Sequence, residues 1–146
     1  MRPIDELPSH RKGEYTESVV IAELQRRGVP VSRPVGDNER YDLVPQSDHE
    51  FRSAQVKTGP VMNGCVYVRG KSQHTNSQGH VYKTYDDEVD CFIVYCHDLQ
   101  TMYLVPADVV GSAMHLRVED PEQHDSSINW AEDYEFDARW PDIRPV

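Results

Sequence analysis

The chain has 146 residues and a net charge of −10, and 38% of its residues are hydrophobic. This length is typical of one domain that buries a core without disulfide support. No apolar run is long enough to span a bilayer, and the first residues have no apolar segment like that of a secretory signal peptide. Three cysteines, Cys65, Cys91 and Cys96, lack metal-ligand spacing. They are expected to be buried free thiols of a protein in a reducing cytoplasm.

The negative charge is concentrated in the second part of the chain. Residues 1–85 carry 12 Lys+Arg and 10 Asp+Glu, a net charge of +2, whereas residues 86–146 carry 3 Lys+Arg and 15 Asp+Glu, a net charge of −12. A strongly acidic, lysine-poor surface favours adaptation to high internal salt, with an ordinary acidic mesophilic protein as the alternative. We therefore expect the acidic tail from Glu119 to be a solvated exterior and the first part to carry the function.

A helix is predicted over residues 11–27, with Ser9 as its N-cap and Gly28 at its end. An apolar stripe with helical spacing begins at Val20. Glu17 lies one helical turn before Val20, so its carboxylate is expected on the buried stripe. A carboxylate at such a position requires a partner.

The rest of the chain alternates short apolar segments with turns, which favours strands. The order of elements indicates an α/β fold with a small mixed β-sheet flanked by helices. Residues 91–96 form a continuous apolar run, as expected for a central buried strand. Strands are predicted over 29–33, 41–44, 51–57, 66–68, 91–96 and 103–105, and short helices over 106–113 and 128–134.

Four polar positions converge on one predicted strand. Residues i and i+2 of a strand point to the same face, so Gln55 and Lys57 project together while Val56 turns into the core. Asp42 on the preceding strand and Glu17 on the helix add two carboxylates. Oxygen ligands suit Mg²⁺, and a lysine beside them can hold an attacking water or offset charge on a phosphate. The pattern predicts a site for phosphodiester hydrolysis with a metal ion bound by Asp42, the Gln55 amide and the Val56 carbonyl, and with Glu17 bound to the metal or to its water.

The polar segment 70–84 has no hydrophobic period and is predicted to be a long loop. Its basic character, which extends over about residues 69–85, favours contact with nucleic-acid phosphates, with a plain surface loop as the alternative. The seven histidines show no zinc-binding spacing. The residues predicted to bind DNA are Arg11, Lys12, Arg69, Lys71, His74 and Lys83.

A helical Glu, a strand Asp and a Q-x-K strand in this order resemble the PD-(D/E)xK nuclease superfamily. The segment KGEYTE at residues 12–17 is similar to the opening of archaeal Holliday-junction resolvases. A stronger similarity is to the PD-(D/E)xK endonucleases associated with group I introns, which also carry Gln in the third motif. It extends over YDDEVDCFIVYCHDLQTMYLVP at 85–106 and WAEDY at 130–134, and so over nearly the whole chain.

The resemblance implies a restriction-endonuclease-like core and a Mg²⁺-dependent, homing-type endonuclease for double-stranded DNA. Mn²⁺ is expected to replace Mg²⁺, and no organic cofactor is implied. Glu17, Asp42, Gln55 and Lys57 match the catalytic positions of the family, with Tyr41 in place of its proline. Cleavage of both strands by so small a domain requires two active sites, so a homodimer or homotetramer is expected.

Two other functions fit the same residues. One is a junction-resolving or repair nuclease that recognises DNA shape, and the other is a non-catalytic DNA-binding module in which Gln55 marks a lost activity. Each residue also has a purely structural interpretation. Asp42 can cap a turn, Lys57 can be a solvated edge charge, and Glu17 can form a structural ion pair with Lys57.

Overall fold

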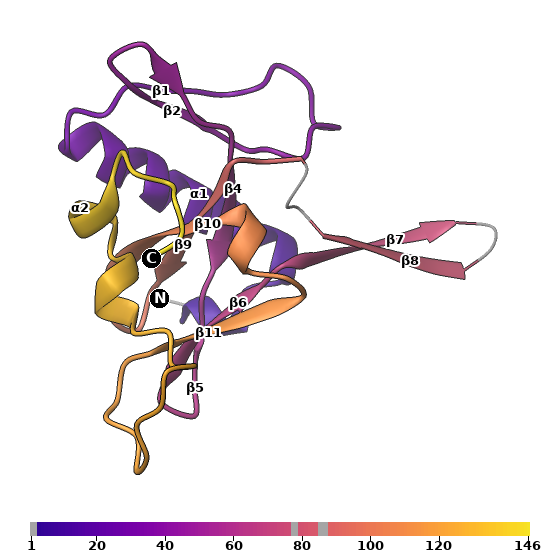
Figure 1. The fold of residues 1–146 in the computed structure, drawn as a ribbon. Helices are drawn as coiled ribbons and strands as arrows, with labels where there is room; N and C mark the ends of the chain where they lie inside the picture. Colours follow the sequence, from indigo (N-terminus) through magenta and orange to yellow (C-terminus); the bar gives the residue numbers. More distant parts are fainter. Residues whose placement is uncertain (1–2, 77–78, 85–87) are drawn as a thin grey trace.

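The computed structural model describes residues 3–76, 79–84 and 88–146, with side chains described over 3–70 and 88–146. Figure 1 shows the arrangement of its elements. The helices are η1 Ile4–Glu6, α1 Ser9–Arg26, η2 Ala107–Val109, η3 Ala131–Tyr134 and α2 Phe136–Arg139. The strands are β1 Val31–Ser32, β2 Val44–Ser47, β3 Glu50–Phe51, β4 Ala54–Thr58, β5 Val61–Met62, β6 Cys65–Arg69, β7 Lys71–Asn76, β8 Gly79–Thr84, β9 Cys91–Cys96, β10 Thr101–Pro106 and β11 Ala113–Arg117.

The centre of the fold is a mixed sheet of three strands in the order β10–β9–β4. The middle strand β9 is buried at every position, because it has a strand on either side and an apolar cluster on each face. β4 runs parallel to β9, with Lys57 beside Val94, and β10 runs antiparallel to it, with Leu104 beside Ile93. The predicted central strand and the predicted mixed sheet are both confirmed.

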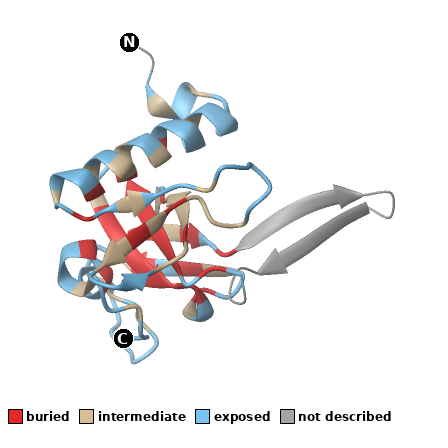
Figure 2. Cartoon of the chain, turned by 90° about the horizontal axis from the view of Figure 1, so that it is seen from above, coloured by how far each residue is buried: buried red, intermediate tan, exposed pale blue. Residues whose placement is uncertain are grey.

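Helix α1 covers one face of this sheet, with its exposed side turned outward (Figure 2). Its buried residues Val20 and Leu24 pack with Ala54 of β4 and Ile93 of β9. The repeat of these apolar side chains at helical spacing places one stripe of α1 on the sheet. The strand β4 is therefore held between the helix and β9.

The two ends of α1 differ in how well the sequence predicted them. The predicted Ser9 cap is wrong, because Pro8 is the N-cap and its carbonyl accepts the Lys12 amide at 3.0 Å. Gly28 ends the helix as predicted, with a φ of 70° that a residue without Cβ adopts at no steric cost. The Val29 amide then donates to the Leu24 carbonyl at 2.9 Å and closes the last turn.

A second sheet, in the order β11–β6–β5, covers the other face of the central sheet. Val66, Val68 and Leu116 from this sheet pack with Phe92 and Val94 of β9. The predicted strand at residues 66–68 is the middle of β6, and it pairs antiparallel with β11. The predicted helix over 106–113 is shorter than expected, because only η2 is helical and β11 begins at Ala113.

Two predicted strands are divided differently in the structure. Residues 41–44 are not a strand: Leu43 forms a single bridge with Ala54, and β2 begins only at Val44, where the chain turns to pair with β1. Residues 51–57 are also not continuous, since β3 ends at Phe51 and β4 begins at Ala54. In the gap between them, Ser53 bonds to the backbone amide and the carboxylate of Asp90, the residue before β9.

The predicted loop over residues 70–84 is wrong, because β7 and β8 form an antiparallel hairpin in which Lys71 pairs with Thr84. The hairpin extends away from the central sheet in Figure 1. Backbone hydrogen bonds hold such a ribbon without an apolar face, so hydrophobic periodicity does not reveal it.

The C-terminal part packs short helices on the core. Tyr134 of η3 and Phe136 of α2 are buried, and the Phe136 ring stacks on Trp140 at 5.4 Å. The described Asp and Glu side chains from position 88 onward all belong to exposed residues, as predicted for a solvated acidic exterior. No helix within the described ranges is long and apolar enough to cross a membrane.

Candidate active site

Two hydrogen bonds connect Asp42 to the edge of β4 that does not pair with β9. Its backbone amide donates to the Ala54 carbonyl at 2.8 Å, and its Oδ2 accepts the backbone amide of Val56 at 2.9 Å. These two contacts lie on either side of Gln55 in the sequence. The Asp42 carboxylate is therefore held at the strand that carries the Q-x-K motif, although Asp42 itself lies in a bend and not in the predicted strand.

Glu17 reaches the same region from α1. Its side chain is 23% exposed, and its Oε1 lies 3.1 Å from Nη2 of Arg33. Glu17 and Asp42 both line a pocket of about 190 Å³ between α1 and the segment that leads from β1 to Leu43. We call it the carboxylate pocket, and its other lining residues are Arg33, Pro34, Gly36, Asp37, Glu39 and Tyr41.

Burial disfavours the charged forms of both Glu17 and Asp42. Burial raises the pKa of Asp42, while the Val56 amide and the Lys57 charge lower it. Burial also raises the pKa of Glu17, and the charge of Asp42 raises it further. Half-buried carboxylates that repel each other are stabilised by a shared cation. This arrangement is not that of two solvated surface acids.

Lys57 lies near Asp42, on the opposite face of β4 from Val56, and does not line the carboxylate pocket. Its Nζ is 5.7 Å from the centre of the Phe92 ring, whereas Val56 packs with the apolar cluster under α1. The predicted opposite orientation of Val56 and Lys57 is therefore present. Burial lowers the pKa of Lys57 to about 8, although the Asp42 charge opposes this effect. Such a lysine changes its protonation near neutral pH.

The donor set fits a small divalent ion better than zinc. The described part of the chain has no group of three His, Cys, Asp or Glu side chains that can hold a metal. Mg²⁺ is commonly held by one or two carboxylates and keeps several waters. In a strand, the amide and carbonyl of one residue point toward the same edge, so the Val56 carbonyl lies on the edge that faces Asp42.

The residues predicted to contact DNA are only partly described. Arg11 is exposed on α1, and Lys12 lies 3.9 Å from Asp5. Arg69 is exposed at the end of β6, and its charge acts on Lys57. The side chains of Lys71, His74 and Lys83 lie outside the described residues.

A buried hydrogen-bond chain joins α1 to the ends of β4 and β9. Thr16 is 1% exposed, and its Oγ1 lies 2.6 Å from Oγ1 of Thr58 and 2.9 Å from Nε2 of His97. The His97 ring stacks on Tyr15 at 5.4 Å and meets the edge of Tyr95 at 4.8 Å. We call Thr16, Thr58 and His97 the threonine clamp.

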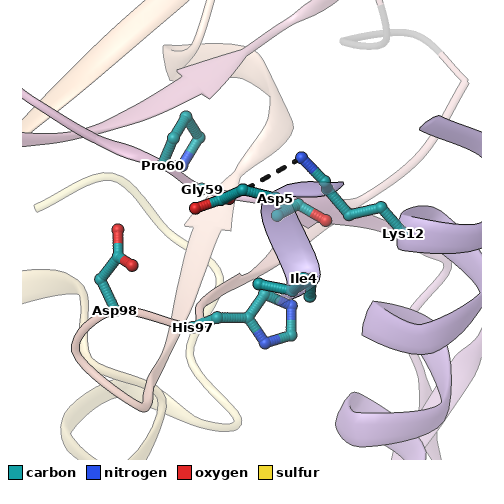
Figure 3. A pocket seen from close by; sticks show the side chains of 8 residues that line it. Ile4, Asp5, Lys12, Gly59, Pro60, His97 and Asp98 are labelled. Carbon is teal, nitrogen blue, oxygen red and sulfur yellow. Dashed lines mark ion pairs between the residues drawn. The ribbon is translucent and has the colours of Figure 1, made fainter. Parts of the chain in front are cut away.

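The threonine clamp borders a second pocket, of about 250 Å³, at the N-terminal end of α1 (Figure 3). Its labelled side chains include His97, Lys12 and Asp5, with the last two joined by an ion pair. Burial and the Lys12 charge lower the pKa of His97, so the imidazole is neutral near pH 7. This pocket does not include any of the four predicted catalytic side chains.

Sequence reasoning missed Arg33 and the threonine clamp. Arg33 lies between Ser32 and Pro34 in a segment that the sequence predicts only as a strand end. Thr16 and Thr58 directly neighbour Glu17 and Lys57, and this adjacency is the one signal that could have pointed to them. The three cysteines are free and buried as predicted, and burial raises the pKa of Cys91 to about 12.

The family model and the solved structure that match this chain are both those of endonucleases. A family model described as a PD-(D/E)XK endonuclease matches residues 7–137, a range that contains Glu17, Asp42, Gln55 and Lys57. A bacterial homing endonuclease, I-Ssp6803I, is similar in structure, with a TM-score of 0.73 and 26% sequence identity over 88% of this chain and 89% of that one. No curated protein sequence matches the chain. The predicted restriction-endonuclease-like α/β fold is confirmed.

Proposed function

We propose that the chain, which belongs to the PD-(D/E)XK endonuclease family, cleaves DNA as a homing-type endonuclease with a divalent ion held at Glu17 and Asp42. The observation that carries this proposal is the meeting of two half-buried carboxylates in one pocket, with one of them, Asp42, bonded to the strand that carries Lys57. A structural role alone does not account for it, because the mutual repulsion of Glu17 and Asp42 is relieved only in part by the exposed Arg33.

Mg²⁺ is the proposed cofactor, with Mn²⁺ as a substitute. Glu17 and Asp42 supply carboxylate oxygens, Gln55 supplies an amide oxygen, and the Val56 carbonyl completes the protein ligands. A bound divalent ion polarises the scissile phosphate and lowers the pKa of a bound water. The exchange of a carboxylate for an amide at Gln55 leaves the site with two negative charges instead of three.

Lys57 is proposed to act as a cation beside the phosphate. Its position next to Gln55 on the Phe92 face keeps the ammonium near Asp42 and Arg69. A positioned positive charge stabilises the negative charge that develops on the phosphate oxygens in the transition state. It also orients a water through its N–H donors.

Double-stranded DNA is the proposed substrate, and the similarity to a homing endonuclease supports it. The β7–β8 hairpin is a two-stranded ribbon of the kind that fits a major groove. Arg11 and Lys12 on α1, together with Arg69, add exposed or half-exposed cations for phosphate contacts. We propose a homodimer or homotetramer, because one site cuts one strand.

A plasmid-nicking assay with Mg²⁺ and with Mn²⁺ tests the enzymatic proposal. The wild-type protein is expected to relax or linearise plasmid, and Asp42→Asn and Lys57→Ala are each expected to lose that activity while keeping a native circular dichroism spectrum. Asp108→Asn is the matched control, because Asp108 is an exposed carboxylate outside the carboxylate pocket. Its activity is expected to equal that of the wild type.

Three outcomes separate the candidate functions. Retention of DNA without cleavage at any metal or salt concentration identifies a non-catalytic binding module. Preferential cleavage of a four-way junction over a linear duplex identifies a structure-selective nuclease. Equal activity of wild type and Asp42→Asn removes the metal site from the proposal.

A further inference from the structure

Arg33 is the cation of the carboxylate pocket. Its guanidinium lies 3.1 Å from Glu17 Oε1, and its charge also acts on Asp42. The Arg33 side chain is 66% exposed, whereas Glu17 is 23% exposed. The arginine is therefore the more exposed partner of the ion pair and lines the pocket.

The pocket carries far more negative than positive charge. Four of its lining residues are acids, and Arg33 is the only basic residue among them. A divalent ion that binds Glu17 and Asp42 brings two positive charges next to the guanidinium. Because like charges at this distance repel, the ion and the guanidinium compete for the Glu17 carboxylate.

We propose that Arg33 is a charge gate, which holds Glu17 in the metal-free protein and transfers to a DNA phosphate when a divalent ion is bound. This inference rests on the proposed function, since it requires that Glu17 and Asp42 bind the ion. An exposed arginine ion pair is weak and breaks at little cost. The planar guanidinium then presents a fork that matches two phosphate oxygens.

The gate couples the binding of the divalent ion to the binding of DNA. DNA draws Arg33 away from Glu17 and so strengthens metal binding, and the metal frees Arg33 and so strengthens DNA binding. Thermodynamic linkage makes these two effects equal in size. Arg33 is thus a positioning residue for Glu17 in the free protein and a phosphate contact in the complex.

Mn²⁺ titration followed by electron paramagnetic resonance tests the first half of the proposal. Without DNA, Arg33→Ala is expected to bind Mn²⁺ about three-fold more tightly than the wild type, as the loss of an exposed ion pair predicts. Arg33→Lys keeps the charge and is expected to remain near the wild-type value. Weaker or unchanged Mn²⁺ binding by Arg33→Ala overturns the gate.

Arg26→Ala is the matched control for this titration. Arg26 lies on α1, is 68% exposed and forms an ion pair with Glu23 at 2.8 Å, but it does not line the carboxylate pocket. Its Mn²⁺ affinity is expected to equal that of the wild type. Asp42→Asn separates the two proposals: if it binds Mn²⁺ normally, the metal site itself is wrong, whereas lost binding with an unaffected Arg33→Ala refutes only the gate.

Fluorescence anisotropy of a labelled duplex, with and without Ca²⁺ at constant ionic strength, tests the second half. Ca²⁺ is expected to tighten DNA binding of the wild type and of Arg26→Ala by the same factor. In Arg33→Ala the tightening is expected to be smaller by about three-fold, the same factor as expected for Mn²⁺. Equal tightening in all three proteins contradicts the transfer of Arg33 to phosphate.

Discussion

Thr16 and Thr58 share a hydrogen bond of 2.6 Å between their hydroxyl oxygens, and each directly neighbours a proposed catalytic residue. Thr16 precedes Glu17 on α1, and Thr58 follows Lys57 on β4. The bond therefore fixes the helix that carries one acid against the strand that carries the lysine. Because Thr16 is also bonded to His97 at the end of β9, a single buried hydroxyl joins three elements.

Thr16→Val is expected to lower the free energy of unfolding by about 1–2 kcal/mol, because it leaves buried polar partners unsatisfied at nearly constant side-chain volume. Urea denaturation measures this change. Thr16→Ser keeps the hydroxyl and is expected to recover much of the loss. Ser18→Ala is the control on the exposed side of α1, where the hydroxyl bonds only to the Glu14 carbonyl. A stability of Thr16→Val equal to that of Ser18→Ala argues against the clamp.

Lys57→Met is expected to abolish cleavage and to raise the stability at pH 7. Burial lowers the pKa of Lys57 from 10.5 to about 8, so the charged form is disfavoured in the folded protein. The penalty is present below pH 8 and disappears as the pH rises toward 10.5, and it amounts to about 3 kcal/mol at pH 7. Urea denaturation at pH 7 and pH 10 measures the gain, which is expected to be much smaller at pH 10 than at pH 7.

Lys12→Met is the control for this gain. Lys12 is 30% exposed and lies 3.9 Å from Asp5. Its replacement is expected to leave the stability at pH 7 unchanged or slightly lower. The outcome that contradicts this is a loss of stability at pH 7 in Lys57→Met that equals or exceeds the loss in Lys12→Met. In that case the buried charge of Lys57 does not destabilise the folded protein.

The pH dependence of single-turnover cleavage is expected to be bell-shaped. As the pH rises through about 8, Lys57 loses its proton and its stabilising charge, so the rate is expected to fall about ten-fold between pH 7 and pH 9. As the pH falls, Glu17 and Asp42 take up protons earlier than ordinary acids do, because their pKa values are raised. A rate that climbs steadily above pH 8 shows that Lys57 acts as a neutral base and not as a cation.

The proposed site residues were identified from their local spacing in the sequence. Gln55 and Lys57 share a face through the two-residue period of a strand, and Glu17 follows from the helical period of α1. The Cys91–Cys96 strand was also predicted correctly, from its unbroken apolar run. In each case burial decides which positions of the element are apolar.

Contacts between distant segments were not predictable in this way. Asp42 is connected to β4 by hydrogen bonds of its amide to Ala54 and of its carboxylate to Val56, and no local pattern marks such bonds. Arg33 meets Glu17 only because the chain after β1 folds back over α1. The β7–β8 hairpin depends on backbone pairing and so left no hydrophobic signature.

Gln55→Glu is expected to tighten Mn²⁺ binding about ten-fold, because it restores a third negative charge to a site that now has two carboxylates. Gln55 lies between Ala54 and Val56, the two residues of β4 to which Asp42 is hydrogen-bonded. Isothermal titration with Mn²⁺ measures the change, and Gln55→Ala is expected to weaken binding by losing the amide oxygen. Gln46→Glu is the control, because Gln46 lies on β2 and its amide bonds to the Asp48 carbonyl. If Gln55→Glu and Gln46→Glu change Mn²⁺ affinity equally, the effect is that of overall charge and Gln55 is not a ligand.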